Sequence, residues 1–211
     1  MKFVGRAPTN TKQKLIDTAS ELIWQNSYGS VSVDDICKAA DVKKGSFYHY
    51  FPSKVDLAIA AMEDHFIHDM KPALDEIFSP SIPAVERYEK LADFIYEEQA
   101  KTQEQYGRVC GCPFATLGSE MAGQEETIRA KTDDVFKSCR RYHENALRDL
   151  IADGLLEETV DVNVRASEME TYIMGQLMMA RIQNNLDPLK RDLKTGLFRI
   201  LNINYEIKEA V

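Results

Sequence analysis

The stretch Ser32-Val-Asp-Asp-Ile-Cys-Lys-Ala-Ala-Asp-Val-Lys-Lys-Gly-Ser-Phe-Tyr-His-Tyr-Phe51 has the pattern of two short helices joined by a tight turn. Ser32, followed three residues later by Asp35, is a variant of the capping box that begins a helix. Asp41 occupies the turn, where the chain needs a residue that tolerates a positive φ. A second helix is expected over residues 44–51. The stretch therefore predicts a helix-turn-helix.

The second of these helices has one face for the core and one for a partner. Phe47 and Phe51 are four residues apart and are expected to face inward. This turns Lys44, Gly45 and Tyr48 outward, and the missing side chain of Gly45 lets the backbone come close to a groove or a phosphate. Such a helix fits the major groove of DNA. A helical hairpin that only packs would explain the two phenylalanines but not the polar aromatic residues between them.

Charge is distributed unevenly along the chain. The 211 residues carry a net charge of −8, yet residues 1–54 contain eight Lys and Arg against five Asp and Glu. A mildly basic N-terminal segment followed by an acidic remainder suits a protein that contacts phosphates through its N-terminal end only. No apolar run approaches the roughly 18 residues of a membrane span. Because the first residues also lack the apolar core of a signal peptide, we expect a cytoplasmic protein. The four cysteines are too few for a disulfide scaffold.

Helical periodicity extends through the rest of the chain, and strand signals are scarce. We expect an all-α fold of about nine helices. A helix-turn-helix DNA-binding domain of three helices is expected over residues 1–56, and a larger helical ligand-binding and dimerisation domain over residues 57–211. A fourth helix, at about 53–78, links the two domains. The later helices are expected at about 83–104, 113–122, 124–153, 163–185 and 188–207.

Four segments within residues 10–60 resemble the TetR family of bacterial regulators, namely Ser-Val-Asp-Asp-Ile, Ala-Asp-Val, Lys-Gly-Ser-Phe-Tyr-His-Tyr-Phe and Ser-Lys-Val-Asp-Leu. The resemblance implies a homodimeric transcriptional repressor whose two recognition helices enter successive major grooves of a near-palindromic, double-stranded DNA operator. It also implies a C-terminal pocket for a small-molecule inducer that releases the DNA. No motif in the sequence predicts a cofactor.

The resemblance assigns DNA contacts by position. The residues expected to approach bases are Lys44, Gly45, Ser46 and Tyr48. Those expected to hold phosphates are Ser32, Tyr48, Tyr50 and Lys54, and His49 suits either role. Two positions depart from the family pattern, because Asp41 replaces the usual Gly and Lys43 replaces the Ser, Thr or Pro that usually opens the recognition helix. Lys43 opposes the helix dipole there, although it would be favourable facing a phosphate.

A second segment, Arg108-Val-Cys-Gly-Cys-Pro-Phe-Ala-Thr-Leu-Gly-Ser-Glu-Met121, resembles a TetR subgroup that includes sensors of reactive electrophiles and acrylate-like compounds. If Pro113 is the first helical residue, Cys112 is the N-cap. The positive end of the helix, with Arg108 nearby, would lower the pKa of this thiol and favour the thiolate. Alkylation or oxidation of Cys112 would then report an electrophile. The alternative is a buried, inert cysteine packed beside Phe114.

A metal site is a further alternative. Cys110 and Cys112 are separated by one residue, and Cys139 and His143 share a face of the long helix. These four zinc-type ligands would converge only if that helix folds back beside residues 110–112. Because a lone Cys/His pair at this spacing is usually incidental, the expected metal content is none.

Soft and aromatic side chains of the C-terminal part are candidates for the inducer pocket. The expected ligand or redox sensor comprises Cys112, Cys110, Tyr106, Phe114, Tyr142, Met174 and Met178. Apolar faces of the last two helices are expected to meet their symmetry mates in a four-helix dimer interface. The residues of those faces are Met169, Ile173, Leu177, Ala180, Leu193, Leu197, Ile200 and Leu201.

Other function classes stay open. A ligand-independent DNA-binding factor would lack a C-terminal cavity, whereas a repressor should have one of roughly a few hundred Å³. A helical enzyme using Cys112 and His143, with Glu120 as a third member, is a weaker alternative, since the sequence has no Gly-rich phosphate loop and no nucleophile elbow. Activation in place of repression is compatible with the same residues.

Overall fold

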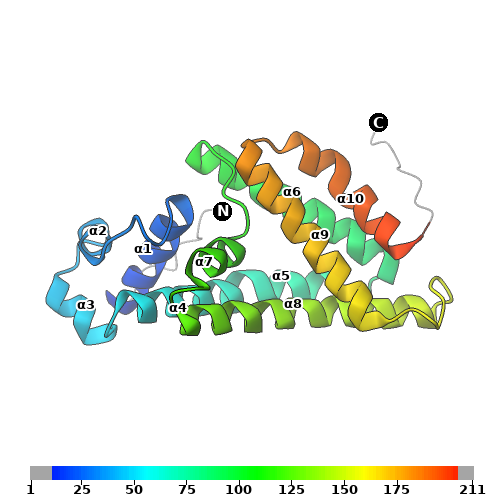
Figure 1. The fold of residues 1–211 in the computed structure, drawn as a ribbon, viewed down its shortest axis with the longest axis horizontal. Coiled ribbons are helices and arrows are strands. Elements are labelled where there is room, and N and C mark those ends of the chain that lie inside the picture. The colour runs from blue at the N-terminus through cyan, green and yellow to red at the C-terminus, as the bar shows by residue number, and fades with distance from the viewer. Residues whose placement is uncertain (1–10, 204–211) are drawn as a thin grey trace. The chain divides into compact units, whose positions relative to one another are not determined.

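The computed structural model describes residues 11–203, and within them every element of regular structure is helical. The elements are α1 (Thr11–Gln25), α2 (Val33–Ala39), α3 (Lys44–Tyr50), α4 (Lys54–His65), the π-helical segment η1 (Phe66–Met70), α5 (Lys71–Ile77), α6 (Ala84–Tyr106), α7 (Pro113–Met121), α8 (Glu126–Ala152), α9 (Val162–Gln183) and α10 (Asp187–Leu201) (Figure 1). Because α4, η1 and α5 follow one another without a break, the described residues form nine continuous helical stretches. The predicted all-α fold is confirmed. None of these helices is long and apolar enough to cross a membrane.

The helices divide into two compact units. The first unit comprises residues up to Pro72 together with Cys112–Val135, and the second comprises Ala73–Gly111 together with the residues from Phe136 on. The predicted boundary after residue 56 falls inside α4, which packs along α1. Helix α7, expected in the C-terminal domain, also belongs to the first unit and contacts α1. The outer ends of the predicted domains and of the predicted last helix, residues 1–10 and 204–211, lie outside the described residues.

Helix α1 is the central element of the first unit, since α2, α3, α4 and α7 all contact it. Its apolar stripe includes Leu15 and Ala19, both fully buried. The neighbouring helices contribute Ile36, Phe47 and Leu57, which also have no exposed surface. Burying one large apolar side chain stabilises a fold by roughly 1.5–3 kcal/mol. Helices as short as α2 and α3 are marginal in isolation, so this packing holds them in place.

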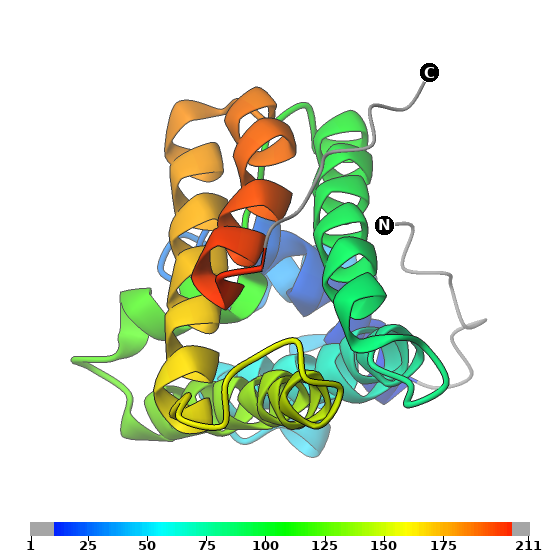
Figure 2. The ribbon, with the colours of Figure 1, turned by 90° about the vertical axis from the view of Figure 1, so that its right-hand side faces the viewer.

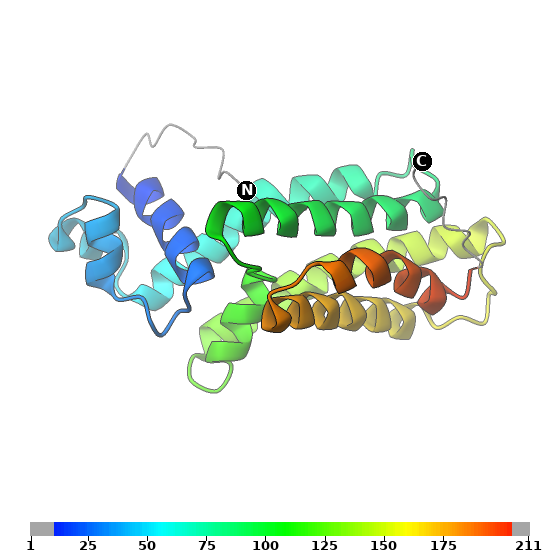
Figure 3. The same ribbon diagram turned by 90° about the horizontal axis from the view of Figure 1, so that it is seen from above.

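In the second unit, α9 and α10 lie side by side, and α10 also contacts α6 (Figures 2 and 3). Leu193 and Leu197 of α10 are buried in the core. Gly196 lies against the ring of Tyr172, so that a side chain added at Gly196 would overlap the Tyr172 hydroxyl. That hydroxyl donates a hydrogen bond to the carbonyl of Asp192 (2.8 Å). The close approach of α9 and α10 therefore depends on a glycine at position 196.

The apolar residues predicted for the dimer interface belong to this core. Those buried within a single chain are Met169, Ile173, Leu177, Ala180, Leu193, Leu197 and Leu201, and Ile200 is half-buried. Both helices bury these residues inside the second unit. Helix α10 is amphipathic, whereas α9 carries apolar side chains on more than one face. The exposed apolar residues of α9 are different ones, namely Val164, Met178, Met179 and Ile182.

Candidate nucleic-acid interface

Helix α2 begins where the sequence predicts, and side chains close its first turn. Ser32 is the N-cap, and its hydroxyl accepts a hydrogen bond from the Asp35 amide (3.1 Å). The Asp35 carboxylate accepts one from the Ser32 amide (2.9 Å), which completes the capping box. Hydrogen bonds from Ser32 lower the pKa of Asp35. The exposed hydroxyl of Ser32, predicted to contact a phosphate, thus already orders the start of α2.

The turn between α2 and α3 is made at Asp41. Its φ of 50° lies in the left-handed region, as predicted. The amide of Val42 then donates a hydrogen bond to the carbonyl of Cys37 (2.9 Å), which satisfies one of the last carbonyls of α2. This tight turn fixes the direction in which α3 leaves α2.

Helix α3 presents the predicted recognition face to solvent. Phe47 is fully buried and Phe51 is 4% exposed, so these two rings anchor the helix. Tyr48 and Tyr50 are 51% and 37% exposed. A Cβ added at Gly45 would meet no atom within 4 Å, so the space in front of this position is open. The remaining predicted contact residues here are exposed or half-buried, namely Lys43, Lys44, Ser46 and His49.

Lys44 forms an ion pair with Asp34 of α2 at 2.8 Å. The hydrogen bond and the negative charge of Asp34 raise the pKa of Lys44. Both side chains are largely exposed, and ion pairs of this kind contribute little to stability. The ammonium of Lys44 is therefore available to exchange Asp34 for a phosphate.

Lys54 makes its contacts inside the chain. Its Nζ donates hydrogen bonds to the carbonyls of Tyr28 and Val31, both at 2.8 Å, and lies 3.8 Å from the centroid of the Tyr28 ring. Burial lowers the pKa of Lys54, and the charge of Glu120 opposes this effect. Lys54 was predicted to hold a phosphate, but in this geometry its ammonium fixes the loop between α1 and α2, residues 26–32, which we call the α1–α2 loop.

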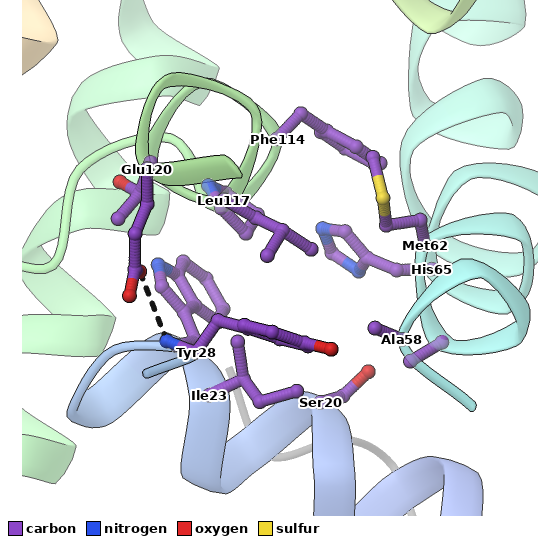
Figure 4. Close-up of a pocket in the computed structure, with 13 residues that line it drawn as sticks. Ser20, Ile23, Tyr28, Ala58, Met62, His65, Phe114, Leu117 and Glu120 are labelled. Carbon is purple, nitrogen blue, oxygen red and sulfur yellow. Dashed lines mark hydrogen bonds between the residues drawn. The ribbon is translucent and has the colours of Figure 1, made fainter. Parts of the chain in front are cut away.

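Glu120 of α7 holds the same loop through its amides. One carboxylate oxygen accepts a hydrogen bond from the Tyr28 amide at 3.0 Å (Figure 4). The other accepts one from the Gly29 amide at 2.7 Å. Tyr28 and Glu120 are 92 residues apart, so no local pattern in the sequence could reveal this contact. The α1–α2 loop is therefore bound by a carboxylate and by an ammonium from two different helices.

Helices α1, α4 and α7 enclose a small pocket beside this contact (Figure 4). Its lining includes Trp24 and His65, which sequence reasoning did not select, and Phe114, which it did. The His65 and Phe114 rings are stacked with centroids 5.4 Å apart. The cavity measures about 40 Å³, enough for a few water molecules and too small for a drug-sized inducer.

Cys112 is the N-cap of α7, and Pro113 is the first helical residue, as predicted. The sulfur accepts a hydrogen bond from the Ala115 amide at 3.5 Å. The residue is only 8% exposed. Because the residue is largely covered, a group added to this sulfur displaces neighbouring atoms.

Cys110 differs from Cys112 in its electrostatic surroundings. Burial raises the pKa of the Cys110 thiol, although the charges of Arg108 and Arg181 act in the opposite direction. The charge of Arg108 acts on Cys110, and its predicted effect on the thiol of Cys112 stays a prediction. Of the two thiols, Cys112 is the one at a helix N-terminus.

The other residues predicted for the inducer pocket all lie in the second unit. Tyr142 donates a hydrogen bond to Asp75 and lines an open groove of about 470 Å³ in the second unit. Arg87 and Asp149 line the same groove and form an ion pair at 2.5 Å. The remaining residues of the predicted set in this unit are Cys110, which is buried, Tyr106 and Met174, which are half-buried, and Met178, which is exposed.

The described residues contain no group of three or more His, Cys, Asp and Glu side chains that could hold a metal ion. Cys112 belongs to the first unit, whereas Cys110, Cys139 and His143 belong to the second. His143 lies among aromatic rings, stacked on Tyr88 at 5.9 Å and edge-on to Phe78 at 5.5 Å. The alternative zinc site therefore has no supporting geometry.

Two family profiles match the chain. The profile described as "Bacterial regulatory proteins, tetR family" matches residues 15–61, and the one described as "Tetracyclin repressor-like, C-terminal domain" matches residues 88–195. The transcriptional regulator AcuR of Cereibacter sphaeroides is 30% identical over 184 residues, which cover 87% of this chain and 82% of AcuR. The repressor NemR of Escherichia coli is 24% identical, with 87% of this chain and 90% of NemR covered.

Solved structures share the fold. The regulatory protein TetR from Rhodobacter sphaeroides superimposes with a TM-score of 0.74 and 28% identity, covering 90% of this chain and 95% of its own. The reduced form of E. coli NemR gives a TM-score of 0.73 and 22% identity, covering 92% and 97%. The first profile spans the helix-turn-helix and its flanking helices, and the second spans about half of the chain. The chain is therefore a member of the TetR family of bacterial regulatory proteins.

Proposed function

We propose that the protein is a homodimeric transcriptional repressor that binds a near-palindromic operator and leaves it when a small molecule binds or when Cys112 is modified. The observation that carries this proposal is the outer face of α3. There Tyr48, Tyr50 and two lysines project from a helix that is anchored by the buried Phe47. Tyrosine hydroxyls and lysine ammonium groups are donors for phosphate oxygens and base edges.

Replacing Tyr48 with Ala tests the DNA-binding face. Specific affinity for the operator is expected to fall by about tenfold or more, because one contact at a base edge contributes roughly 1–3 kcal/mol. Affinity is measured by gel shift with the region upstream of the protein's own gene. Thermal unfolding should be unchanged, since Tyr48 is half-exposed. The variant Lys44→Ala is also expected to bind DNA weakly. Lys71→Ala is its matched control, because Lys71 is an exposed lysine outside this face. Unchanged binding by Tyr48→Ala and Lys44→Ala would contradict the assignment of α3.

A dimer supplies the second recognition helix. Two half-sites in successive major grooves lie about 34–36 Å apart, which one helix-turn-helix cannot span. In the second unit, α9 carries Val164, Met178, Met179 and Ile182 on its exposed surface. Apolar side chains exposed together on one helix favour burial against a second copy. We therefore propose the surface of α9 that carries these four residues as the dimer face, in place of the buried residues predicted from sequence.

Cys112 is the proposed chemical trigger. Its thiolate would add to the β-carbon of an α,β-unsaturated carbonyl compound, forming a C–S bond while the C=C π electrons move to the α-carbon, which takes a proton from water. The thiol proton has left to solvent beforehand. Similarity to the repressor NemR and the regulator AcuR supports a role as a transcriptional regulator. The covered position of Cys112 then converts the adduct into a displacement of α7.

The variant Cys112→Ser tests the trigger. It should bind the operator as the parent protein does, yet no longer be released by N-ethylmaleimide. Cys139→Ser serves as the matched control, because Cys139 is half-buried on a different helix and its loss should leave the release intact. Equal release of Cys112→Ser and the parent protein would exclude the thiol trigger and favour a non-covalent inducer. A protein that no electrophile or inducer releases would point to the ligand-independent DNA-binding factor.

A further inference from the structure

We propose that Glu120 is a positioning residue for operator binding, whose carboxylate on α7 holds the α1–α2 loop and so transmits the position of α7 to the helix-turn-helix. This inference rests on the proposed DNA-binding function and adds the route by which α7 controls it. All residues involved belong to the first unit.

The carboxylate of Glu120 holds the α1–α2 loop in a defined orientation. The two oxygens of Glu120 accept hydrogen bonds from consecutive amides, those of Tyr28 and Gly29, at 3.0 and 2.7 Å. Hydrogen bonds to a charged acceptor are the stronger kind, and two parallel bonds also fix orientation. A lateral or axial shift of α7 therefore pulls on the loop or breaks both bonds.

Gly29 is adapted to this contact. A Cβ added there would lie 3.0 Å from Oε1 of Glu120, which is closer than ordinary van der Waals contact. A side chain at this position would therefore crowd the carboxylate that binds the backbone. The carbonyl side of the same loop is held by Lys54, so the loop has charged partners for its donors and for its acceptors.

The loop leads directly into the helix-turn-helix. The carbonyl of Val31, bound by Lys54, precedes Ser32, the N-cap of α2. Only Ser30 and Val31 separate Gly29 from this cap. A displacement at Gly29 therefore reaches α2, and through the tight turn at Asp41 it reaches α3.

Helix α7 is positioned closely enough to transmit a shift. A Cβ added at Gly118 would lie 2.5 Å from Cγ2 of Thr132, so α7 meets the first half of α8 at Gly118 with no room for a side chain there. On another side Phe114 stacks on His65 of α4. Packed helices move as units, so a group forced in at Cys112 moves the end that carries Glu120 as well.

The test compares Glu120→Ala, Glu120→Gln and the control Ser119→Ala, an exposed position on the same helix. Hydrogen exchange is measured at individual amides, and affinity is measured for DNA that the parent protein selects from a random pool. For Glu120→Ala we expect the Tyr28 and Gly29 amides to exchange at least about tenfold faster and operator affinity to fall about tenfold. Glu120→Gln keeps one acceptor oxygen and should lie between Glu120→Ala and the parent protein, and Ser119→Ala should match the parent.

Local exchange separates positioning from general destabilisation. If Glu120→Ala lowered the overall stability of the unit, amide exchange would accelerate throughout α1 and α4. If it removed only the hydrogen bonds to Glu120, exchange would accelerate in the α1–α2 loop. Faster loop exchange with parental operator affinity would overturn the proposal, and so would unchanged loop exchange. If the parent protein itself selects no DNA, the proposed function fails. If the parent binds DNA and Glu120→Ala binds it equally well, only the role of Glu120 fails.

Coupling to Cys112 gives a second readout. If Glu120 transmits the displacement of α7, modification by N-ethylmaleimide and the Glu120→Ala substitution should be non-additive, so that the modified variant binds DNA no more weakly than the unmodified variant. Additive losses would show that modified Cys112 acts by a route that does not include Glu120. The reference for this comparison is the loss of DNA binding that N-ethylmaleimide causes in the parent protein.

Discussion

His143 is a fully enclosed histidine in the second unit, and its surroundings keep it neutral. Burial, with a smaller contribution from the charge of Arg140, lowers the pKa of His143 to about 4. The ring packs on Tyr88 and Phe78. In the unfolded chain the same imidazole has a pKa near 6.5. The unfolded state therefore binds a proton that the folded state does not accept until the pH is much lower.

The free energy of unfolding should consequently fall as the pH drops from about 6.5 to about 4, by on the order of 3 kcal/mol at the lower limit. Above pH 6.5 His143 contributes no pH dependence. Urea unfolding at pH 7 and pH 5 measures this, and His143→Phe should lose less stability between the two than the parent protein. His49→Gln, which removes an exposed histidine, should keep the parental difference. Identical differences for all three proteins would contradict this account.

Single residues also show what local chemistry predicts well. The cap at Ser32 and Asp35, the positive φ at Asp41 and the N-cap at Cys112 all follow from neighbours within a few positions, and all three are confirmed. Lys54 shows the converse. Its sequence position suggested a phosphate, but its partners are loop carbonyls 23 and 26 residues away.

At the scale of elements, the contact between α9 and α10 depends on Gly196. Substitution by Ala would drive a methyl group into the Tyr172 hydroxyl, which also donates to the Asp192 carbonyl. Overpacking of a core costs roughly 1–3 kcal/mol, so Gly196→Ala should lower the free energy of unfolding by about 2 kcal/mol. Thermal or urea unfolding measures the change.

Gly175 of α9 provides the comparison, because a Cβ there would meet no atom within 4 Å. Gly175→Ala should raise stability by roughly 0.5–1 kcal/mol through helix propensity alone. Equal effects of the two substitutions would mean that Tyr172 moves aside without cost. Such close approaches are invisible in the sequence, because a glycine within a helix pattern looks the same whether its surroundings are open or filled.

At the scale of the whole molecule, the exposed apolar residues of α9 predict how two copies associate. Ile182 is 68% exposed and Val164 is 55% exposed. Ile182→Glu places a charge in the proposed dimer face, so sedimentation at micromolar concentration should detect monomers. Operator affinity should fall with the loss of the second half-site contact. Helical content should not change.

Leu155→Glu is the matched control, since Leu155 is 49% exposed but lies outside α9. This variant should remain dimeric. Dimeric Ile182→Glu would place the interface elsewhere, and a monomeric parent protein would remove the basis for two half-sites.

The sequence by itself determined the helix-turn-helix, the all-α class and the capped start of α7, because caps, turns and helical periodicity are set by residues a few positions apart. Tertiary structure alone decided which apolar faces pair, that α7 joins the first unit, and that Glu120 and Lys54 hold the α1–α2 loop. The physical reason is that these contacts join residues tens of positions apart. An amphipathic pattern states that a face will be buried, but not against which partner.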